Sequence, residues 1–232
     1  MLETNLKQIL ADISKGNNLG EPITLVGATK MVDADTINKA ISLGLKVVAE
    51  NKVQEFNQKH ELIVGADEHF IGHLQTNKVK YLVGKVNLIQ SVDSDKLAFE
   101  IDKQAKKKNL VQNVLIEINI GGELSKSGFS LEQAREQTIE IAKRYSNLCV
   151  KGLMAMLPHT DNESLIESLC QKMRELYDKL KLYGLPFEFL SMGMSNDYKV
   201  AIKNGSNMIR LGSSIFGKRN YINMKEEING CI

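Results

Sequence analysis

The sequence predicts a single-domain α/β protein, a closed (β/α)8 TIM barrel with an additional N-terminal helix. Eight apolar runs of strand length alternate with helical patterns along the 232 residues. The runs are mostly apolar throughout, as in parallel strands that are covered on both faces. No Pro/Gly/Ser-rich linker or low-complexity tract divides the chain. We therefore expect one domain over residues 1–232, a length at which single barrels are common.

Each predicted element has its own local signal. Leu2, Leu6, Ile9 and Ile13 recur at helical spacing and predict a first helix that ends before Gly16. The predicted strands are 23–30, 46–51, 68–74 (ending near residue 73), 86–93, 111–120, 148–156, a short run ending at residue 191, and 207–211. The predicted helices between them are about 33–43, a segment after residue 51, 94–108, 131–145, 163–182, and two that open at residues 195 and 213. The serine at position 94 is a cap for its helix.

The composition argues against several classes of partner. Lys and Arg number 30 against 28 Asp and Glu, a net charge of +2, and no basic stripe is interleaved with aromatics, so nucleic acid is not expected. Cys149, Cys170 and Cys231 are odd in number and far apart, which suits a reducing compartment and excludes the usual metal spacings. The N-terminus lacks the basic start and apolar run of a signal peptide, and no later run could span a bilayer. We expect a cytoplasmic protein with no membrane or metal partner.

The stretch 190–217 carries the most specific local pattern. It predicts a strand, a turn at Gly193 and a helix capped by Ser195, then a second strand and a second helix capped by Ser213. Two such junctions place unpaired backbone N–H groups close together, and barrel enzymes favour a phosphate site after their last two strands. Arg210, at the end of the second strand, points to the same place. The alternative is two ordinary connecting loops.

Lys30 is the last residue of the first predicted strand. At the rim of an apolar barrel a lysine loses part of its hydration, and this favours the neutral amine that forms a Schiff base with a carbonyl compound. The alternative is a lysine whose stem packs on the barrel while its head reaches water. Pyridoxal 5′-phosphate (PLP) carries both an aldehyde and a phosphate, so a phosphate site on the same mouth favours PLP as the cofactor.

Several motifs then carry a resemblance that covers essentially the whole chain. They are LVGATK, AENKVQE, HFIGHLQTNK, EINIGGELSKSG, GLMAM and LSMGMSNDYKVAI, followed by GSNMIRLGSSIFGKRNY. In these motifs the chain resembles the pyridoxal phosphate homeostasis proteins (YggS/PROSC-like), relatives of the alanine racemase N-terminal barrel and of fold-type III PLP proteins. Ala49 and Thr29 stand where glycine and serine are usual, and neither change removes a group that binding needs.

The resemblance implies a role for each residue of the phosphate side. Lys30 would form the Schiff base with PLP. Ser195, Gly212 and Ser213 would hold the cofactor phosphate, and Met192 would line the same turn.

The resemblance also implies neighbours for the pyridine ring. Arg210 would face the ring nitrogen, which it leaves unprotonated, so the cofactor would be a poor electron sink. Asn51 and His73 would sit near the ring, and a satisfied polar residue on the rim is the alternative for His73. Asn119 either faces the mouth or forms a simple turn at the end of its strand.

The loop 125–128 resembles a family motif near the cofactor entrance. A lid or transfer role for Lys126 is one hypothesis, and a solvent-exposed loop lysine is the other. Racemases of this barrel type use a second base from an extra domain, and the chain here ends soon after the eighth unit. Tyr198 or Tyr221 could replace that base, although a structural role fits either tyrosine.

These considerations predict a monomeric, non-catalytic PLP-binding protein for PLP homeostasis. It would buffer the cofactor and deliver it, with PLP-dependent apo-enzymes as partners. One alternative is a small PLP-dependent amino-acid racemase. A second is a Schiff-base aldolase that acts on a phosphorylated sugar and binds no cofactor.

Overall fold

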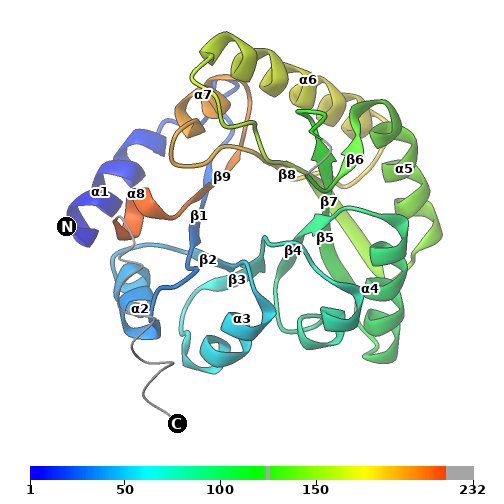
Figure 1. Ribbon diagram of the computed structural model, residues 1–232, viewed down its shortest axis with the longest axis horizontal. Coiled ribbons are helices and arrows are strands. Elements are labelled where there is room, and N and C mark those ends of the chain that lie inside the picture. The colour runs from blue at the N-terminus through cyan, green and yellow to red at the C-terminus, as the bar shows by residue number, and fades with distance from the viewer. Residues whose placement is uncertain (124–125, 218–232) are drawn as a thin grey trace.

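The strands of the protein form a closed ring that the helices surround, as the computed structural model of residues 1–123 and 126–217 shows (Figure 1). The ring strands are β1 (Thr24–Ala28), β2 (Val47–Glu50), β3 (Asp67–Phe70), β4 (Leu88–Val92), β5 (Gln112–Asn119), β7 (Leu148–Ala155), β8 (Phe189–Ser191) and β9 (Met208–Leu211). Each pairs in parallel with the next, and β9 pairs again with β1. The predicted eight-stranded barrel is confirmed.

One further strand lies beside this regular ring. A two-residue strand, β6 (Phe129–Ser130), adds to the upper end of β5 through Ile118 and Asn119. Among the residues discussed from the sequence, Ser125, Tyr221 and Cys231 lie outside the described residues.

Two predicted strand ends are wrong. β1 ends at Ala28, so Lys30 lies in the turn after the strand and is not its last residue. β3 pairs with β2 only as far as Phe70, and His73 lies in the following loop. A Cβ atom built on Gly72 would stand 2.0 Å from the carbonyl oxygen of Asn51, so only glycine allows this approach. The chain leaves the sheet here, three residues before the predicted end.

The helices form the outer layer of the barrel. They are α1 (Leu2–Ile13), α2 (Ala34–Ser42), α3 (Val53–Lys59), α4 (Asp95–Lys107), α5 (Leu131–Arg144), α6 (Glu163–Leu182), α7 (Tyr198–Lys203) and α8 (Ser213–Phe216), with two 3-10 helices, η1 (His60–Leu62) and η2 (Thr76–Tyr81). The Ser94 hydroxyl accepts from the N–H of Leu97 at 3.3 Å and caps α4, as predicted. Among the described helices, none is long and apolar enough to cross a membrane.

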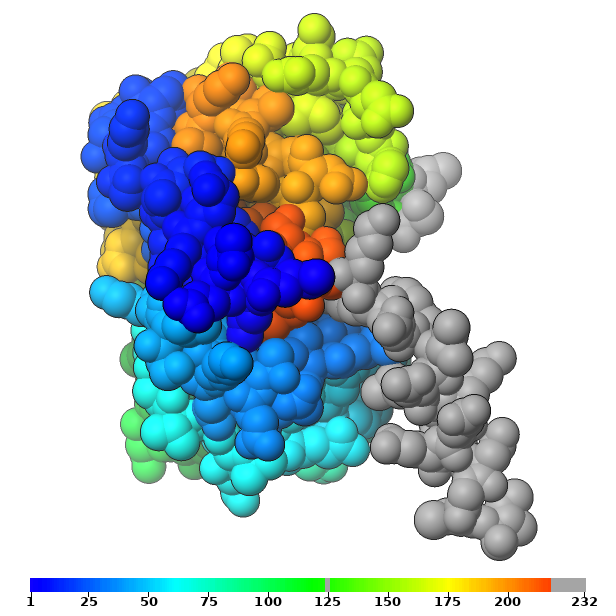
Figure 2. Space-filling view, turned by 90° about the vertical axis from the view of Figure 1, so that its left-hand side faces the viewer, coloured from blue at the N-terminus to red at the C-terminus, as the bar shows by residue number. Residues whose placement is uncertain are grey.

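The first helix lies against the last one. Figure 2 shows α1, in dark blue, beside the orange-red α8, and the Asn5 amide donates to the carbonyl oxygen of Ile215 at 3.3 Å. α8 follows β9 directly, so this contact supports the segment that carries Gly212 and Ser213.

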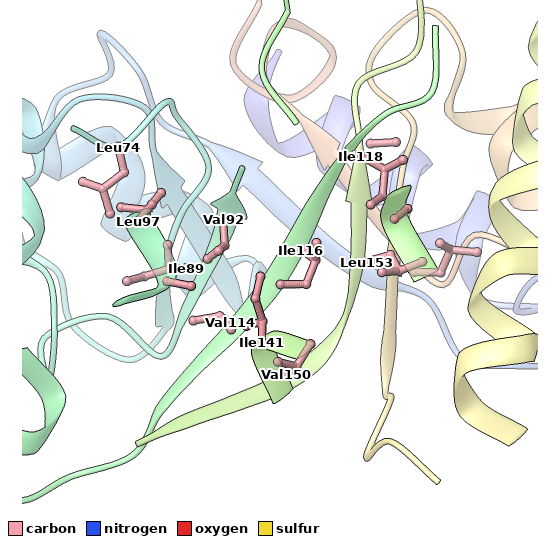
Figure 3. Close-up of a cluster of buried hydrophobic side chains, with 14 of the residues drawn as sticks. Leu74, Ile89, Val92, Leu97, Val114, Ile116, Ile118, Ile141, Val150 and Leu153 are labelled. Atoms are coloured by element: carbon pink, nitrogen blue, oxygen red, sulfur yellow. The ribbon is translucent and has the colours of Figure 1, made fainter. Parts of the chain in front are cut away.

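Apolar side chains fill both sides of the strand ring. Outside it, strand residues such as Ile116 and Val150 lie beside helix residues such as Ile141 of α5 (Figure 3). Inside it, one buried apolar cluster fills the barrel interior beneath the carboxyl ends of the strands. Its members are Val26, Val47, Ala49, Leu88, Leu115, Met154 and Met208. The interior is therefore a packed core, and a ligand can enter only at the carboxyl ends of the strands.

Candidate cofactor site at the barrel mouth

A cavity of about 910 Å³ opens at the carboxyl ends of the strands. It is lined by six of the eight residues to which the sequence analysis assigns a cofactor role, namely Lys30, Asn51, Ser195, Arg210, Gly212 and Ser213. On the interior face of β1, Val26 lies in the buried cluster, and Ala28 follows it on the same face, whereas Lys30 lies in the turn after the strand. Both Ala28 and Lys30 line the cavity.

The other two assigned residues lie elsewhere. The Met192 side chain is fully buried in the apolar core under the turn at Gly193 and does not line the cavity. His73 stands on the rim with 62% of its side chain exposed, and its Nδ1 lies 3.0 Å from the Asp93 carboxylate.

The loops after β8 and β9 lie together as predicted, but the local structure of each loop differs from the predicted serine-capped helix. The hydroxyls of Ser195 and Ser213 lie 3.1 Å apart across the two loops. Neither serine caps a helix, which corrects the prediction. A turn at 195–197 precedes α7, where Asp197 takes the cap position, and Gly212 takes it at α8.

The two loops present free backbone donors to the cavity. Within residues 1–123 and 126–217, no protein acceptor contacts the N–H groups of Ser195, Asn196, Ser213 or Ser214. Successive unpaired N–H groups in a concave turn attract an oxyanion. With the two serine hydroxyls beside them, this side of the cavity suits a phosphate group.

Arg210 is almost completely buried and is held entirely by neutral partners. Its Nη1 donates to the Ser191 hydroxyl at 2.7 Å and to the Ser191 carbonyl at 2.9 Å, and its Nη2 donates to the Ala155 carbonyl at 2.9 Å. Burial lowers the pKa of Arg210 to about 10, so it remains protonated at neutral pH. In the described part of the chain its Nε–H has no protein acceptor, and Arg210 lines the cavity. It can therefore donate a hydrogen bond to a ligand.

The hydrogen bonds of Arg210 continue across the inside of the barrel. The Ser191 hydroxyl is 2.7 Å from the Gln90 side-chain oxygen, and the Gln90 amide nitrogen is 3.1 Å from Nδ1 of His69. Because a guanidinium can only donate, Ser191 must donate to Gln90, and Gln90 must donate to His69. His69 is then neutral with its proton on Nε2. Burial lowers its pKa to about 4, which agrees with that assignment.

Glu117 is a buried carboxyl group on the interior face of β5, near Arg210. Burial raises its pKa to about 7, and the negative charge of Asp93 adds to this, whereas Arg210 and His73 oppose it. Strongly shifted pKa values cluster at functional sites, and Glu117 lies close to Arg210, which lines the cavity, although Glu117 itself does not.

The opposite rim is closed by contacts between loops. Ser127 Oγ lies 3.3 Å from Nδ1 of His73, the same nitrogen that Asp93 contacts, so these residues do not form a nucleophilic triad. The Asn119 amide donates to the carbonyls of Glu123 and Lys126 at 2.9 and 3.1 Å, which agrees with a strand-end turn. Lys126 forms an ion pair with Glu123.

Sequence reasoning placed Ser191 at the end of its strand but missed two residues that the barrel brings near it, Gln90 and Glu117. Gln90, Glu117 and Ser191 come from β4, β5 and β8 and are all buried. Alternation in β5 does place Glu117 on the face of the interior residue Leu115, and this signal could have identified it. No local signal links Gln90 to Ser191, which lie 101 residues apart. His159, which received no role from the sequence, also lines the cavity.

Comparison with known proteins finds relatives over most of the chain. The family described as alanine racemase, N-terminal domain, matches residues 5–220. The pyridoxal phosphate homeostasis protein of Aquifex aeolicus is 46% identical over 200 residues, which are 85% of this chain and 87% of that protein.

Solved structures extend this comparison to three dimensions. PipY of Synechococcus elongatus PCC7942, in a structure with PLP bound, has a TM-score of 0.82 and 25% identity, over 94% of this chain and 100% of that chain. Alanine racemase of Clostridium difficile 630 has a TM-score of 0.77 and 17% identity, over 94% of this chain and 56% of the racemase. The racemase comparison shows the shared barrel fold.

Proposed function

Because this chain belongs to the family of pyridoxal phosphate homeostasis proteins, we propose that it binds PLP at the barrel mouth and serves intracellular PLP homeostasis. One observation carries the proposal at the level of residues. A single cavity has Lys30 on one wall and, on another, free backbone N–H groups beside the hydroxyls of Ser195 and Ser213. An aldehyde that also bears a phosphate matches both walls.

The donors of the cavity suit the parts of the cofactor. Lys30 would hold PLP as a Schiff base, and Ser195, Gly212 and Ser213 would bind its phosphate. Arg210 would donate its free N–H toward the ring nitrogen. When bound, PLP supplies a carbonyl group for amines and a conjugated ring that can withdraw electrons.

The remaining assigned residues take supporting positions in this proposal. Asn51 lines the cavity and is proposed beside the ring. His73 is proposed on the rim near the ring, and Met192 supports the phosphate turn from the core.

We infer a carrier rather than an efficient enzyme from two features of these residues. Arg210 stays protonated and is tied to Ser191 and Ala155, so it offers a hydrogen bond to the ring but no proton. Tyr198, a candidate second base, places its hydroxyl 3.4 Å from Asp12 of α1, on the outside of the barrel. Inversion of an α-carbon needs a second acid or base positioned opposite the lysine, and neither of these two residues supplies it.

The first experiment records the absorbance of the purified protein with PLP, followed by borohydride reduction and peptide mapping. We expect a visible band and a pyridoxyl adduct on Lys30, both absent from Lys30→Ala and retained by the surface variant Lys7→Ala. A colourless, unlabelled protein would contradict PLP binding and would leave the sugar aldolase as the better reading.

A second experiment separates the carrier from the racemase. The PLP-loaded protein is incubated with common L-amino acids, and the products are resolved by chiral chromatography. The carrier predicts no significant turnover, and robust racemisation or decarboxylation would make the protein an enzyme.

Delivery and assembly complete the proposal. We infer that PLP-dependent apo-enzymes receive the cofactor in the cytoplasm and that the protein acts as a monomer. Reactivation of an apo-enzyme faster than by free PLP at equal concentration would support delivery. Light scattering tests the monomer, which a dimer mass would contradict.

A further inference from the structure

We propose that Glu55 and Lys59 of α3 are positioning residues for Lys30, although neither lines the cavity. They bind the two peptide groups on either side of Lys30 from outside the barrel. This inference rests on the proposed role of Lys30 as the PLP anchor and adds a mechanism that holds its amine in place.

The two contacts flank Lys30 directly. The ammonium group of Lys59 donates to the carbonyl oxygen of Thr29 at 3.0 Å, and the Glu55 carboxylate accepts from the N–H of Met31 at 2.7 Å. Glu55 and Lys59 stand four residues apart on one helix face, and their side chains lie 3.4 Å apart. We call these two side chains the α3 bracket.

The backbone inside the α3 bracket is strained. Met31 has φ of 60°, in the left-handed region that few residues other than glycine adopt. The Val32 N–H donates to the Thr29 carbonyl at 2.9 Å, so Thr29 to Val32 form a tight turn with Met31 at its third position. Such a position normally takes glycine or asparagine. Strain of this kind persists only where surrounding contacts impose it, and Glu55 supplies such a contact.

Burial makes the α3 bracket stiff. Lys59 is only 14% exposed and also contacts the Glu50 carboxylate at 2.7 Å, which in turn lies 2.7 Å from the Thr29 hydroxyl. Charge-assisted hydrogen bonds that water does not reach are stronger and shorter than neutral ones. The turn is thus attached on its outer side to a buried ionic network, while Lys30 points to the inner side.

The residues that hold the turn around Lys30 are different from the residues that line the cavity. Glu50, Glu55 and Lys59 are absent from the cavity lining, so they cannot contact the ligand there. Their effect must pass through the Thr29–Val32 turn, and its loss should spread the positions of the Lys30 amine. Misplacement of a reacting group by about 1 Å can cost up to about 100-fold in rate.

The test compares Glu55→Ala and Lys59→Met with two matched controls. Glu55→Gln keeps an oxygen that can accept the Met31 N–H, and Lys7→Met breaks an exposed ion pair of the same i,i+4 spacing with Glu3. The first readout is the rate at which the visible band forms after PLP is added, well below the melting temperature of each variant. The second is the labelling rate of Lys30 by trinitrobenzenesulfonate, measured by peptide mass spectrometry without PLP.

We expect both rates to fall about 10-fold or more in Glu55→Ala and Lys59→Met, and to stay near wild type in the two controls. A lowered melting temperature with unchanged rates would overturn the proposal, because the α3 bracket would then be structural only. If wild type itself forms no band with PLP, the proposed function fails, and the labelling rates still test the α3 bracket by themselves.

A rescue variant covers the case in which a single variant folds poorly. Glycine adopts a positive φ without strain, so Met31→Gly should need Glu55 less. We expect Met31→Gly with Glu55→Ala to recover most of the rate that Glu55→Ala loses. Failure to recover any of it in a folded double variant would contradict the strained turn as the link to Lys30.

Discussion

A buried cation inside the barrel wall and a partly buried cation outside it are bound in opposite ways. Arg210, inside, contacts the Ser191 hydroxyl and the carbonyls of Ser191 and Ala155, all of them neutral. Lys59, outside, contacts the carboxylates of Glu50 and Glu55 as well as one carbonyl.

The difference explains what each cation can do. Two carboxylates and a carbonyl bind the three N–H donors of Lys59, so the ammonium group holds the backbone near Lys30 and offers no donor to a ligand. Dipoles alone bind Arg210 directly, which leaves it an N–H donor toward the cavity and a charge that the nearby Glu117 and Asp197 partly offset. A cation bound by neutral groups is therefore available to a ligand, and one bound by carboxylates is not.

The largest expected effect is the loss of the outer cation. Lys59→Met should lower the free energy of unfolding by about 3–5 kcal/mol, because it leaves the buried Glu50 carboxylate and its neighbour Glu55 without a counter-charge. Arg210→Met should cost less, because only neutral groups lose their partner. Chemical denaturation of both variants measures the difference. If Arg210→Met proves the more costly, carboxylate pairing does not distinguish the two cations.

The next effect concerns pH and the carboxyl group beside Arg210. The folded protein holds the pKa of Glu117 at about 7, above its ordinary 4.5, so the native state binds the proton more tightly than the unfolded chain. Stability from this group is complete below pH 4.5 and is lost as the pH rises through 7, by about 3 kcal/mol in total. Glu117→Gln should remove that loss, and denaturation at pH 5 and pH 8 measures it.

His69 provides a check on the sign. Its folded pKa of about 4 lies below its ordinary 6.5, so its contribution is lost as the pH falls from 6.5 towards 4. The two groups act in opposite directions, and a decline in stability above pH 6.5 belongs to Glu117. A wild-type decline above pH 6.5 that persists in Glu117→Gln would reject this assignment.

A smaller effect is expected for the neutral partner of Arg210. Ser191→Ala removes a hydroxyl that accepts from Arg210 and donates to Gln90, and should cost about 1–3 kcal/mol in unfolding free energy. Thr138→Val is the control, because this buried hydroxyl donates only to the Ala134 carbonyl in its own helix. Equal losses in the two variants would mean that the cross-barrel bonds carry no special weight. With PLP bound, Ser191→Ala should also shift the visible band, because the orientation of Arg210 toward the ring nitrogen would be less well fixed.

The smallest effect is expected for an exposed ion pair. Lys7 and Glu3 have the same spacing as Lys59 and Glu55, but their side chains are 68% and 54% exposed. Water and salt screen such a pair, so Lys7→Met should leave the denaturation midpoint unchanged within error. A shift as large as that of Lys59→Met would mean that burial does not set the strength of these pairs.

The site residues at or just after the ends of strands could be predicted from the sequence. Lys30 and Arg210 end or follow apolar runs, and the Gly-Ser turns after the last two strands are local patterns. The cap positions were wrong, because Asp197 and Gly212 rather than Ser195 and Ser213 precede the helices. The end of β3 was also wrong, because it depends on how closely Gly72 approaches Asn51 on a neighbouring segment.

By itself, the sequence determined the eight alternating units and the residues at the ends of the strands, because hydrophobic periodicity is a short-range property. Only the tertiary structure decided the partners of each buried polar group. Closure of the barrel brings β4, β8 and β9 together so that Gln90, Ser191 and Arg210 form one chain of hydrogen bonds. It also sets Lys59 against the peptide before Lys30. Pairings across so many residues exist only once burial removes water as the competing partner.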